Sequence, residues 1–311
     1  MSTISSEAVL DLNGHRIELS HLDKMFWTRE GYHKADLINY YAKVAPILLK
    51  HLQDRPLVWT RYPDGIEKKS FYQKNAPPYL PDWVDTFTYH SQDSGRALNF
   101  ILVQEAATLV WLANQAALEM HPWLSRVESP DRPDYVVFDL DPSPDNEFAQ
   151  VVEVAWMVKR VLDELGLRSY LKTSGADGLH IFVPINNLYD YSQIRAFAQP
   201  VAALVCKLLP HLATIERKVD KRGALIYVDF LQNARGQTLC APYSLRPRPG
   251  APASCPLHWD ELNDIHPSQF NLKTLPPRVQ GLGDLFALVQ EDKQDLSQAM
   301  QQLGMAEKGF V

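Results

Sequence analysis

Three aspartates lie in apolar segments whose alternation is typical of β-strands, and their carboxylates are the side chains best suited to chemistry. Asp139 and Asp141 occur in Tyr135-Val-Val-Phe-Asp-Leu-Asp-Pro142, and Asp229 occurs in Leu225-Ile-Tyr-Val-Asp-Phe230. Successive side chains of a strand point to opposite faces, so Asp139 and Asp141 share one face. Like charges on one face repel, and burying them without a partner is costly. A divalent cation would remove this conflict, because Mg²⁺ and Mn²⁺ are held by carboxylates together with substrate phosphates.

An Asp-x-Asp pair alone is also compatible with a calcium loop or with a purely structural role. The alternation of acidic and hydroxyl residues from Asp139 to Glu147 suits a calcium loop, which needs Gly at its sixth position and Glu at its twelfth. Pro144 and Gln150 occupy those positions, and the preceding segment favours a strand rather than a helix. In the structural role, the carboxylates would lie at the surface of an edge strand. Both alternatives to a catalytic metal site stay open at this point.

A glycine-containing turn joins two further expected strands, in Lys172-Thr-Ser-Gly-Ala-Asp-Gly-Leu-His180. Glycine allows a tight turn and close approach of a ligand, and the exposed amides of such a turn can bind an anion. Ser174 adds a hydroxyl donor, and the ring of His180 can donate to a phosphate. An ordinary glycine hairpin accounts for the segment equally well. It is not a Walker loop, because no Gly-Lys-Ser/Thr ends it.

Basic and aromatic residues form two more groups. Arginines follow the Asp229 segment, and arginine suits bidentate recognition of phosphate. In the N-terminal part, Lys24 and Lys34 bracket Phe26 and Trp27, and basic and aromatic residues alternate again in 69–74. Bases stack on such rings while cations follow the phosphates. The competing interpretation is solvated surface charges beside core aromatics.

Composition restricts the class of protein. The chain has 311 residues, 46% of them hydrophobic, and a formal net charge of −6, as in ordinary globular proteins. We expect no transmembrane helix, because no run of about 18 apolar residues occurs, and no signal peptide in the segment 1–7. The three cysteines, far apart and odd in number, predict a reducing, cytoplasmic location.

Periodicity predicts a compact α/β (α+β) chain, 1–311, in which the aspartates lie on strands. An N-terminal α/β module (about 1–130) is expected to pack on a mainly antiparallel sheet module (about 131–250), followed by an irregular and helical tail (251–311). Apolar spacing predicts helices at 34–52, 106–120, 148–165, 191–209 and 285–303. Strands are expected at 57–61, 100–103, 135–140, 169–173, 179–185 and 225–230, with 238–245 as antiparallel neighbour of the Asp229 strand.

The ordered set of motifs resembles the polymerase domain of bacterial ligase D, a branch of the archaeo-eukaryotic primase superfamily. The segments that carry the resemblance cover nearly the whole chain: His21-Leu-Asp-Lys24, Lys34-Ala-Asp-Leu37, Gln73-Lys-Asn-Ala-Pro77, Phe138-Asp-Leu-Asp-Pro142, Thr173-Ser-Gly-Ala-Asp-Gly-Leu-His180, Val228-Asp-Phe-Leu-Gln-Asn233 and Tyr243-Ser-Leu-Arg246. Each is weak alone, and the order makes the set specific. The resemblance implies a primase-polymerase fold whose sheet module, similar to an RNA-recognition motif, carries the metal site.

The resemblance also implies an activity, which is template-dependent nucleotide addition during bacterial non-homologous end joining, with a preference for ribonucleotides. By motif, the three aspartates would hold two ions of Mn²⁺ or Mg²⁺ and carry the catalysis. The residues implied to contact the incoming nucleotide (NTP or dNTP) are Ser174, His180, Arg222, Gln232, Arg246 and Tyr72. Those implied to contact DNA are Lys24 and Lys34, which would grip a 5′-phosphate at a gap or end, and His121. Asp177 departs from the pattern, since many relatives have Lys or a neutral residue there.

Two other functions stay open on the residues alone. A Mn²⁺-dependent sugar-nucleotide transferase would use Asp-x-Asp without needing Asp229. A non-catalytic DNA-end binding module would keep the fold and need the lysines rather than the aspartates. No segment resembles a ligase or nuclease domain, so we expect ligation to come from a separate ATP-dependent DNA ligase or a missing remainder of the chain. Ku is a further expected partner, the expected location is cytoplasmic and nucleoid-associated, and no membrane is involved.

Overall fold

The computed structural model describes residues 5–90 and 95–305, and the chain forms two compact units. The first unit comprises Met1–Trp123, Thr238–Ser254 and Ser268–Asp284, and the second comprises Leu124–Gln237, Cys255–Pro267 and Leu285–Val311. The chain therefore returns twice to the first unit after it has entered the second. The expected module limits near residues 130 and 250 stay predictions. The expectation about a signal peptide falls mainly on residues 1–4, which lie outside the described residues.

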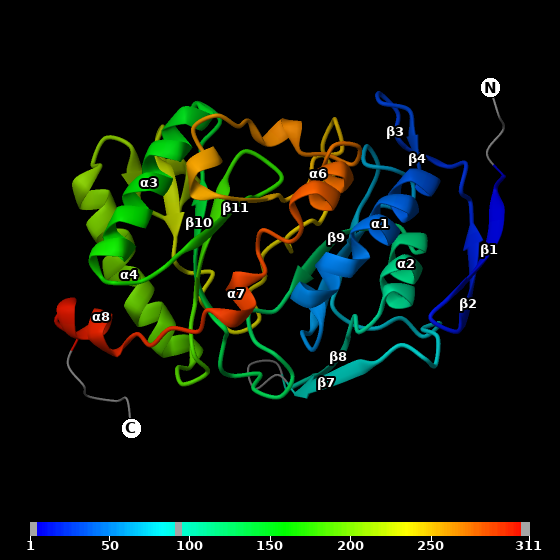
Figure 1. The fold of residues 1–311 in the computed structure, drawn as a ribbon, viewed down its shortest axis with the longest axis horizontal. Coiled ribbons are helices and arrows are strands. Elements are labelled where there is room, and N and C mark those ends of the chain that lie inside the picture. Colours follow the sequence, from blue (N-terminus) through cyan, green and yellow to red (C-terminus); the bar gives the residue numbers. More distant parts are fainter. Residues whose placement is uncertain (1–4, 91–94, 306–311) are drawn as a thin grey trace. The chain divides into compact units, whose positions relative to one another are not determined.

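A six-stranded sheet forms the core of the second unit (Figure 1). All its pairings are antiparallel except that of β13 with β14. The strands lie in the order β13 (Ala213–Thr214), β14 (Ile226–Asp229), β10 (Tyr135–Asp141), β12 (Leu179–Pro184), β11 (Tyr170–Thr173) and β15 (Pro256–Leu257).

Two long helices, α3 (Phe148–Glu164) and α4 (Tyr191–Leu208), pack against each other and against this sheet. A capping hydrogen bond from the Gln193 amide to Asp190 begins α4. On β10, Val136, Phe138 and Leu140 are fully buried, whereas Asp139 and Asp141 are at least partly exposed. The alternation expected from the sequence is therefore confirmed. The shorter helices of this unit are α5 (Val219–Arg222), η1 (Trp259–Glu261), α7 (Leu288–Glu291) and α8 (Ser297–Gln302).

The first unit is built around the long helix α1 (Lys34–Leu52), which buries one apolar stripe, and the helices α2 (Ala106–Asn114) and α6 (Leu275–Leu282). Its main sheet has the order β6 (Phe71–Gln73), β5 (Leu57–Arg61), β8 (Ala97–Ile101) and β7 (Thr86–His90), with β9 (Ala117–Pro122) paired to β5. Two hairpins complete it, β1 (Glu7–Leu12) with β2 (His15–Ser20) and β3 (Met25–Trp27) with β4 (Tyr32–His33). The turn η2 (Pro267–Gln269) lies where the chain passes from the second unit to the first.

Three expected elements were wrong. The helix expected at 106–120 ends at Asn114, because Ala116 adopts a left-handed φ of 64° and the chain then pairs with β5 as β9. The segment 238–245 is not the neighbour of β14, whose partners are β10 and β13, and its Ala241 amide bonds to Met120 instead. The expected helix at 285–303 is divided into α7 and α8, since the Gln294 amide bonds to the Pro184 carbonyl between them.

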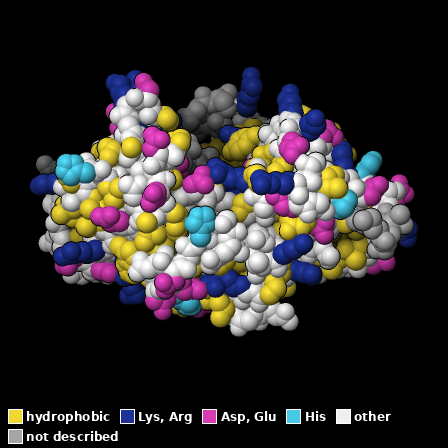
Figure 2. All heavy atoms as spheres, turned by 90° about the horizontal axis from the view of Figure 1, so that it is seen from above, with side chains coloured by type: hydrophobic (Ala, Val, Ile, Leu, Met, Phe, Trp, Pro, Cys, Tyr) yellow, Lys and Arg dark blue, Asp and Glu magenta, His cyan; other side chains and the backbone are white. Residues whose placement is uncertain are grey.

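Surface properties agree with the composition. On the face shown in Figure 2, basic and acidic side chains are interspersed, with hydrophobic side chains between them, so no single acidic patch dominates this face. Within the two described ranges, no helix combines the length and the apolar character needed to cross a bilayer.

Candidate active site

A row of polar residues crosses four neighbouring strands of the second unit. The register pairs Lys172 of β11 with His180 of β12, His180 with Asp139 of β10, and Asp139 with Asp229 of β14. Residues directly opposite one another share a face, with Cβ atoms roughly 5 Å apart. The sheet therefore brings together two of the three aspartates that the sequence singles out, although 90 residues of sequence separate them.

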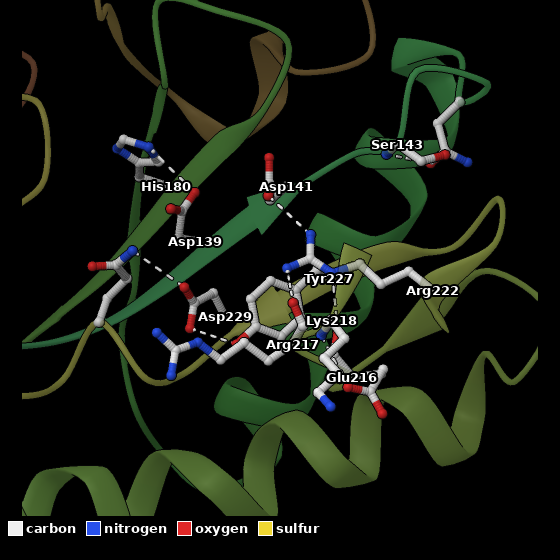
Figure 3. Close-up of polar contacts among 12 residues, drawn as sticks. Asp139, Asp141, Ser143, His180, Glu216, Arg217, Lys218, Arg222, Tyr227 and Asp229 are labelled. Atoms are coloured by element: carbon white, nitrogen blue, oxygen red, sulfur yellow. Dashed lines mark hydrogen bonds and ion pairs between the residues drawn. The ribbon is translucent and has the colours of Figure 1, made fainter. Parts of the chain in front are cut away.

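Asp139 lies beside an imidazole that is itself held by a buried lysine. His180 Nε2 is 3.4 Å from Asp139 Oδ1, and Figure 3 shows the two side chains facing one another. Lys172 is fully buried, and its Nζ lies 2.8 Å from His180 Nδ1. An ammonium that donates to Nδ1 leaves the proton of a neutral imidazole on Nε2, the nitrogen that faces the carboxylate.

Asp229 has a carboxylate that is oriented by its own neighbourhood. Its Oδ1 accepts hydrogen bonds from the Leu231 amide at 2.8 Å and from the Tyr227 hydroxyl at 3.0 Å. Its Oδ2 accepts from Gln232 Nε2 at 3.2 Å. Burial, together with the Asp229 charge, raises the pKa of Tyr227, so its hydroxyl stays protonated as a donor. Gln232, expected beside the nucleotide, thus lies against a catalytic candidate.

Asp141 is more exposed than Asp139 and pairs with a cation. Arg222 Nη1 donates to Asp141 Oδ2 at 3.1 Å, and the guanidinium lies 4.0 Å from the centre of the Tyr227 ring (Figure 3). Backbone carbonyls of Glu216 and Arg217 accept from Nε and Nη2 of the same guanidinium at 2.9 and 2.8 Å. The Arg222 guanidinium therefore has four partners, which are Asp141, the Tyr227 ring and two backbone carbonyls, and its positive charge lies beside the Asp141 carboxylate.

The glycine turn lies directly beside β10. Ser174 Oγ accepts from the amides of Ala176 and Gly178 at 3.0 and 3.1 Å, which closes the turn. Gly178 approaches β10 so closely that a Cβ on it would lie 2.2 Å from the carbonyl oxygen of Leu140, the residue between Asp139 and Asp141. Asp177, the residue that departs from the family pattern, is exposed at the tip of the turn.

The donor set of this sheet face fits a hard divalent cation, because Asp139, Asp141 and Asp229 supply carboxylate oxygens from two paired strands. Across the described residues, no group of three or more His, Cys, Asp or Glu side chains is arranged as a metal-binding cluster. The Asp141 carboxylate forms an ion pair with Arg222 instead. The three-carboxylate metal site therefore stays a prediction, and the chemistry and placement of the carboxylates support it.

The two N-terminal lysines lie side by side in the first unit. The Lys34 amide donates to the Lys24 carbonyl at 2.8 Å, at the open end of the β3–β4 hairpin. Lys24 Nζ pairs with Asp64 at 2.6 Å, and Lys34 Nζ donates to the Ser20 carbonyl at 2.6 Å. Burial, with repulsion from Lys24 and Arg61 added to it, lowers the pKa of Lys34 to about 8.

A second polar group in the first unit is organised by Glu119, a residue that the sequence analysis missed. Arg246 Nε lies 2.9 Å from its Oε1, and His121 Nε2 lies 3.8 Å from its Oε2. Burial would raise the pKa of Glu119, but the nearby His121 and the charge of Arg246 lower it overall. Tyr72 lies in the same unit on β6, with its ring exposed and Lys74 Nζ 5.9 Å from the ring centre.

Glu119 and Lys172 carried a sequence signal that could have found them. Glu119 is a charged residue within the apolar run 116–120, and Lys172 is a charged residue within an expected strand, which is unusual for buried segments unless the charge has a partner. The partner of Glu119 could not be read from spacing alone, because 127 positions separate it from Arg246.

Comparison with known proteins gives one family. Residues 33–286 match the family model described as LigD, primase-polymerase domain. The chain is 34% identical over 292 residues to the bifunctional non-homologous end joining protein LigD of Bacillus subtilis, covering 93% of this chain and 47% of that protein. It is 33% identical over 293 residues to the multifunctional non-homologous end joining protein LigD of Pseudomonas aeruginosa, covering 93% and 34%. The chain thus spans about half or less of these relatives.

The fold has a close counterpart among solved structures. The polymerase domain of Mycobacterium tuberculosis ligase D, solved in complex with DNA, superimposes with a TM-score of 0.83 at 29% sequence identity. The match covers 90% of this chain and 99% of that one. The primase-polymerase fold expected from the motifs is therefore confirmed.

The close approach of Gly178 to β10 generates a prediction. Gly178→Ala should force β12 away from β10 beside Asp139, lowering the free energy of unfolding by about 1–3 kcal/mol, as overpacking does elsewhere. Urea unfolding followed by circular dichroism measures this change. Gly281→Ala in α6 is the control, because its Cβ would meet open space and alanine favours a helix. Equal stability of the two variants would contradict the predicted clash.

Proposed function

Because the chain belongs to the LigD primase-polymerase domain family, we propose that it is a template-dependent nucleotidyltransferase that fills gaps or extends ends in non-homologous end joining. The observation that carries the proposal is the direct pairing of Asp139 with Asp229 beside the glycine turn. Carboxylates that share one sheet face beside a glycine turn with a serine hydroxyl suit a cation and a triphosphate together. The proposal covers polymerase chemistry on this domain, with NTPs favoured over dNTPs.

The three aspartates would hold two ions of Mn²⁺ or Mg²⁺. Such ions, when bound, activate the primer 3′-hydroxyl and stabilise charge on the leaving pyrophosphate. The chain's own contribution is positioning, because catalysis of phosphoryl transfer depends on alignment and on preorganised charge. Asp229 is already oriented by three hydrogen bonds, so little reorganisation is needed at this ligand.

The nucleotide would be bound from the side of the turn. Ser174 Oγ accepts from two turn amides, and its hydroxyl is proposed to donate to a phosphate oxygen when a nucleotide is bound. His180 presents Nε2 at the same face as Asp139. Arg222 and Gln232 would add charge and a hydrogen-bond donor. Arg246 and Tyr72, which belong to the first unit, are also proposed as nucleotide-binding residues.

DNA would be bound by the first unit. Lys24 and Lys34 are proposed to grip a 5′-phosphate at a gap or end, since two adjacent cations suit a doubly charged terminal phosphate better than a backbone phosphodiester. His121 would contact the DNA strand. Ku and a separate ATP-dependent ligase are the proposed protein partners, in the bacterial cytoplasm at the nucleoid.

The central test is extension of a gapped, 5′-phosphorylated duplex with NTPs and dNTPs, in Mn²⁺ and in Mg²⁺. Asp229→Asn should reduce extension by more than about 100-fold, because it weakens a metal ligand without changing the size of the side chain. Asp163→Asn is the control, since Asp163 lies on the exposed face of α3 and pairs only locally with Lys159. A wild-type chain inactive under all four conditions would contradict the proposal, and an active Asp229→Asn would favour a simpler Asp-x-Asp enzyme.

The lowered pKa of Lys34 predicts a pH dependence of phosphate recognition. Lys34 is charged below about pH 8 and loses its charge above it. The preference for 5′-phosphate over 5′-hydroxyl DNA should therefore fall as the pH rises from 7 to 9.5, by about 10-fold if one charged hydrogen bond is lost. Fluorescence anisotropy with the two DNAs measures this preference. Lys34→Arg should flatten the profile, because arginine stays charged, and a profile identical to the wild type would contradict the role of Lys34.

A further inference from the structure

Asn233 is a fully buried polar residue that the proposed chemistry leaves unexplained. It occurs four residues after Asp229, between the end of β14 and Thr238, where the chain enters the first unit again. Its side chain makes three hydrogen bonds, all to backbone: Oδ1 accepts from the Val137 amide at 2.8 Å, and Nδ2 donates to the carbonyls of Val137 and Phe230 at 2.7 and 2.9 Å. Every strong polar group of this side chain is therefore used to hold two backbone segments together.

The position of these bonds coincides with the end of a strand. The ladder between β10 and β14 pairs Asp141 with Tyr227 and Asp139 with Asp229, and β14 stops there. The continued register would place Leu231 opposite Val137. The chain turns away instead. The side-chain carboxamide of Asn233 then supplies the donor and the acceptor that the backbone of a paired residue would have offered to Val137. The side chain thus extends the ladder by one step.

This extension fixes the turn that orients the Asp229 carboxylate. The turn is formed by residues 230–233. The backbone N–H of Asn233 donates to the Phe230 carbonyl at 3.2 Å, in addition to the side-chain hydrogen bond to the same carbonyl. Two donors from inside the turn, the Leu231 amide and Gln232 Nε2, bind the two oxygens of Asp229. Movement of the turn away from β10 would therefore move both donors and, with them, the carboxylate.

We propose that Asn233 is a positioning residue that holds Asp229 in register with Asp139 and so sets the metal affinity of the paired carboxylates. The proposal deepens the proposed function and rests on it for the identity of the site. Asn233 itself touches neither metal nor nucleotide. It acts through a sequence of direct contacts, from Val137 to the Asn233 amide, from Asn233 to the turn, and from the turn to the Asp229 oxygens.

A closely matched control exists in the same unit. Gln294 also uses one side-chain amide to bind both backbone groups of a single residue, accepting from the Arg168 amide at 2.7 Å and donating to the Arg168 carbonyl at 2.9 Å. It also donates to the Pro184 carbonyl at 3.2 Å, and it is buried. Pro184 pairs with Tyr135, four residues before Asp139 on β10, which is about 13 Å away along a strand. Loss of Gln294 should therefore cost similar hydrogen bonds without disturbing the carboxylates.

The experiment measures Mn²⁺ affinity by isothermal titration calorimetry, with no nucleotide or DNA present. Asn233→Ala should weaken Mn²⁺ binding by about 10- to 100-fold, the usual effect of losing a group that orients a metal ligand. Gln294→Ala should leave the affinity within about twofold of the wild type, while urea unfolding shows comparable destabilisation of both variants. Equal Mn²⁺ affinity of Asn233→Ala and wild type, or an equal loss in Gln294→Ala, would overturn the proposal.

A double-mutant cycle separates positioning from general loosening of the fold. In an Asp229→Asn background, Asn233→Ala should cause no further loss of Mn²⁺ affinity, because its effect passes through Asp229. A further loss of the same size would overturn the proposal. Should Asn233→Ala fail to fold, Asn233→Ser is the second variant, because it removes the pair of hydrogen bonds to Val137 with a smaller change in polarity. It is expected to weaken Mn²⁺ binding as well, and unchanged affinity of Asn233→Ser would equally overturn the proposal.

The outcome distinguishes this proposal from the proposed function. A wild-type chain that binds Mn²⁺ but extends no primer contradicts the polymerase assignment and leaves the role of Asn233 measurable. A wild-type chain that binds no Mn²⁺ overturns the role of Asn233 itself.

Discussion

The structure of the second unit depends on one unfavourable interaction, the direct opposition of Asp139 and Asp229 on adjacent antiparallel strands. Residues opposite one another on paired strands have Cβ atoms roughly 5 Å apart, so two carboxylates placed there as like charges repel. Strand pairing brings them together because the opposite face of β10, with Val136, Phe138 and Leu140, is fully buried. A slip of one residue would turn the aspartates into the apolar core, so the register is strongly determined.

The surrounding polar groups are arranged to offset this repulsion. His180 faces Asp139, and Tyr227, Gln232 and the Leu231 amide donate to Asp229. Arg222 provides a full positive charge at Asp141. These groups come from several strands and turns of the same sheet, so the apolar packing beneath the sheet also determines the electrostatics above it. A cation bound between the carboxylates would replace their repulsion with attraction, so the repulsion in the cation-free protein and the proposed metal-dependent function have the same origin.

Local sequence predicted those parts of this arrangement that depend on periodicity. The alternation around Asp139 and Asp141 predicted their shared face, and helix spacing predicted α1, α3 and α4 within one residue at each end. Pairing between distant segments was not predictable in this way. Residues 238–245 have an apolar pattern that suits a strand, yet tertiary contacts in the first unit determine their conformation. Glu119 with Arg246, and Asn233 with Val137, are likewise partners that only the folded chain brings together.

The most direct measurement of the constraint at Asp139 and Asp229 is thermal unfolding of the wild type and of Asp139→Asn, each with EDTA and with Mn²⁺. If repulsion between the paired carboxylates is offset by a bound cation, Asp139→Asn should melt at the same or a higher temperature than the wild type in EDTA. Mn²⁺ should then raise the melting temperature of the wild type and leave that of Asp139→Asn nearly unchanged. Equal stabilisation of both proteins by Mn²⁺, or a wild type that does not respond to Mn²⁺, would contradict a metal site at these carboxylates.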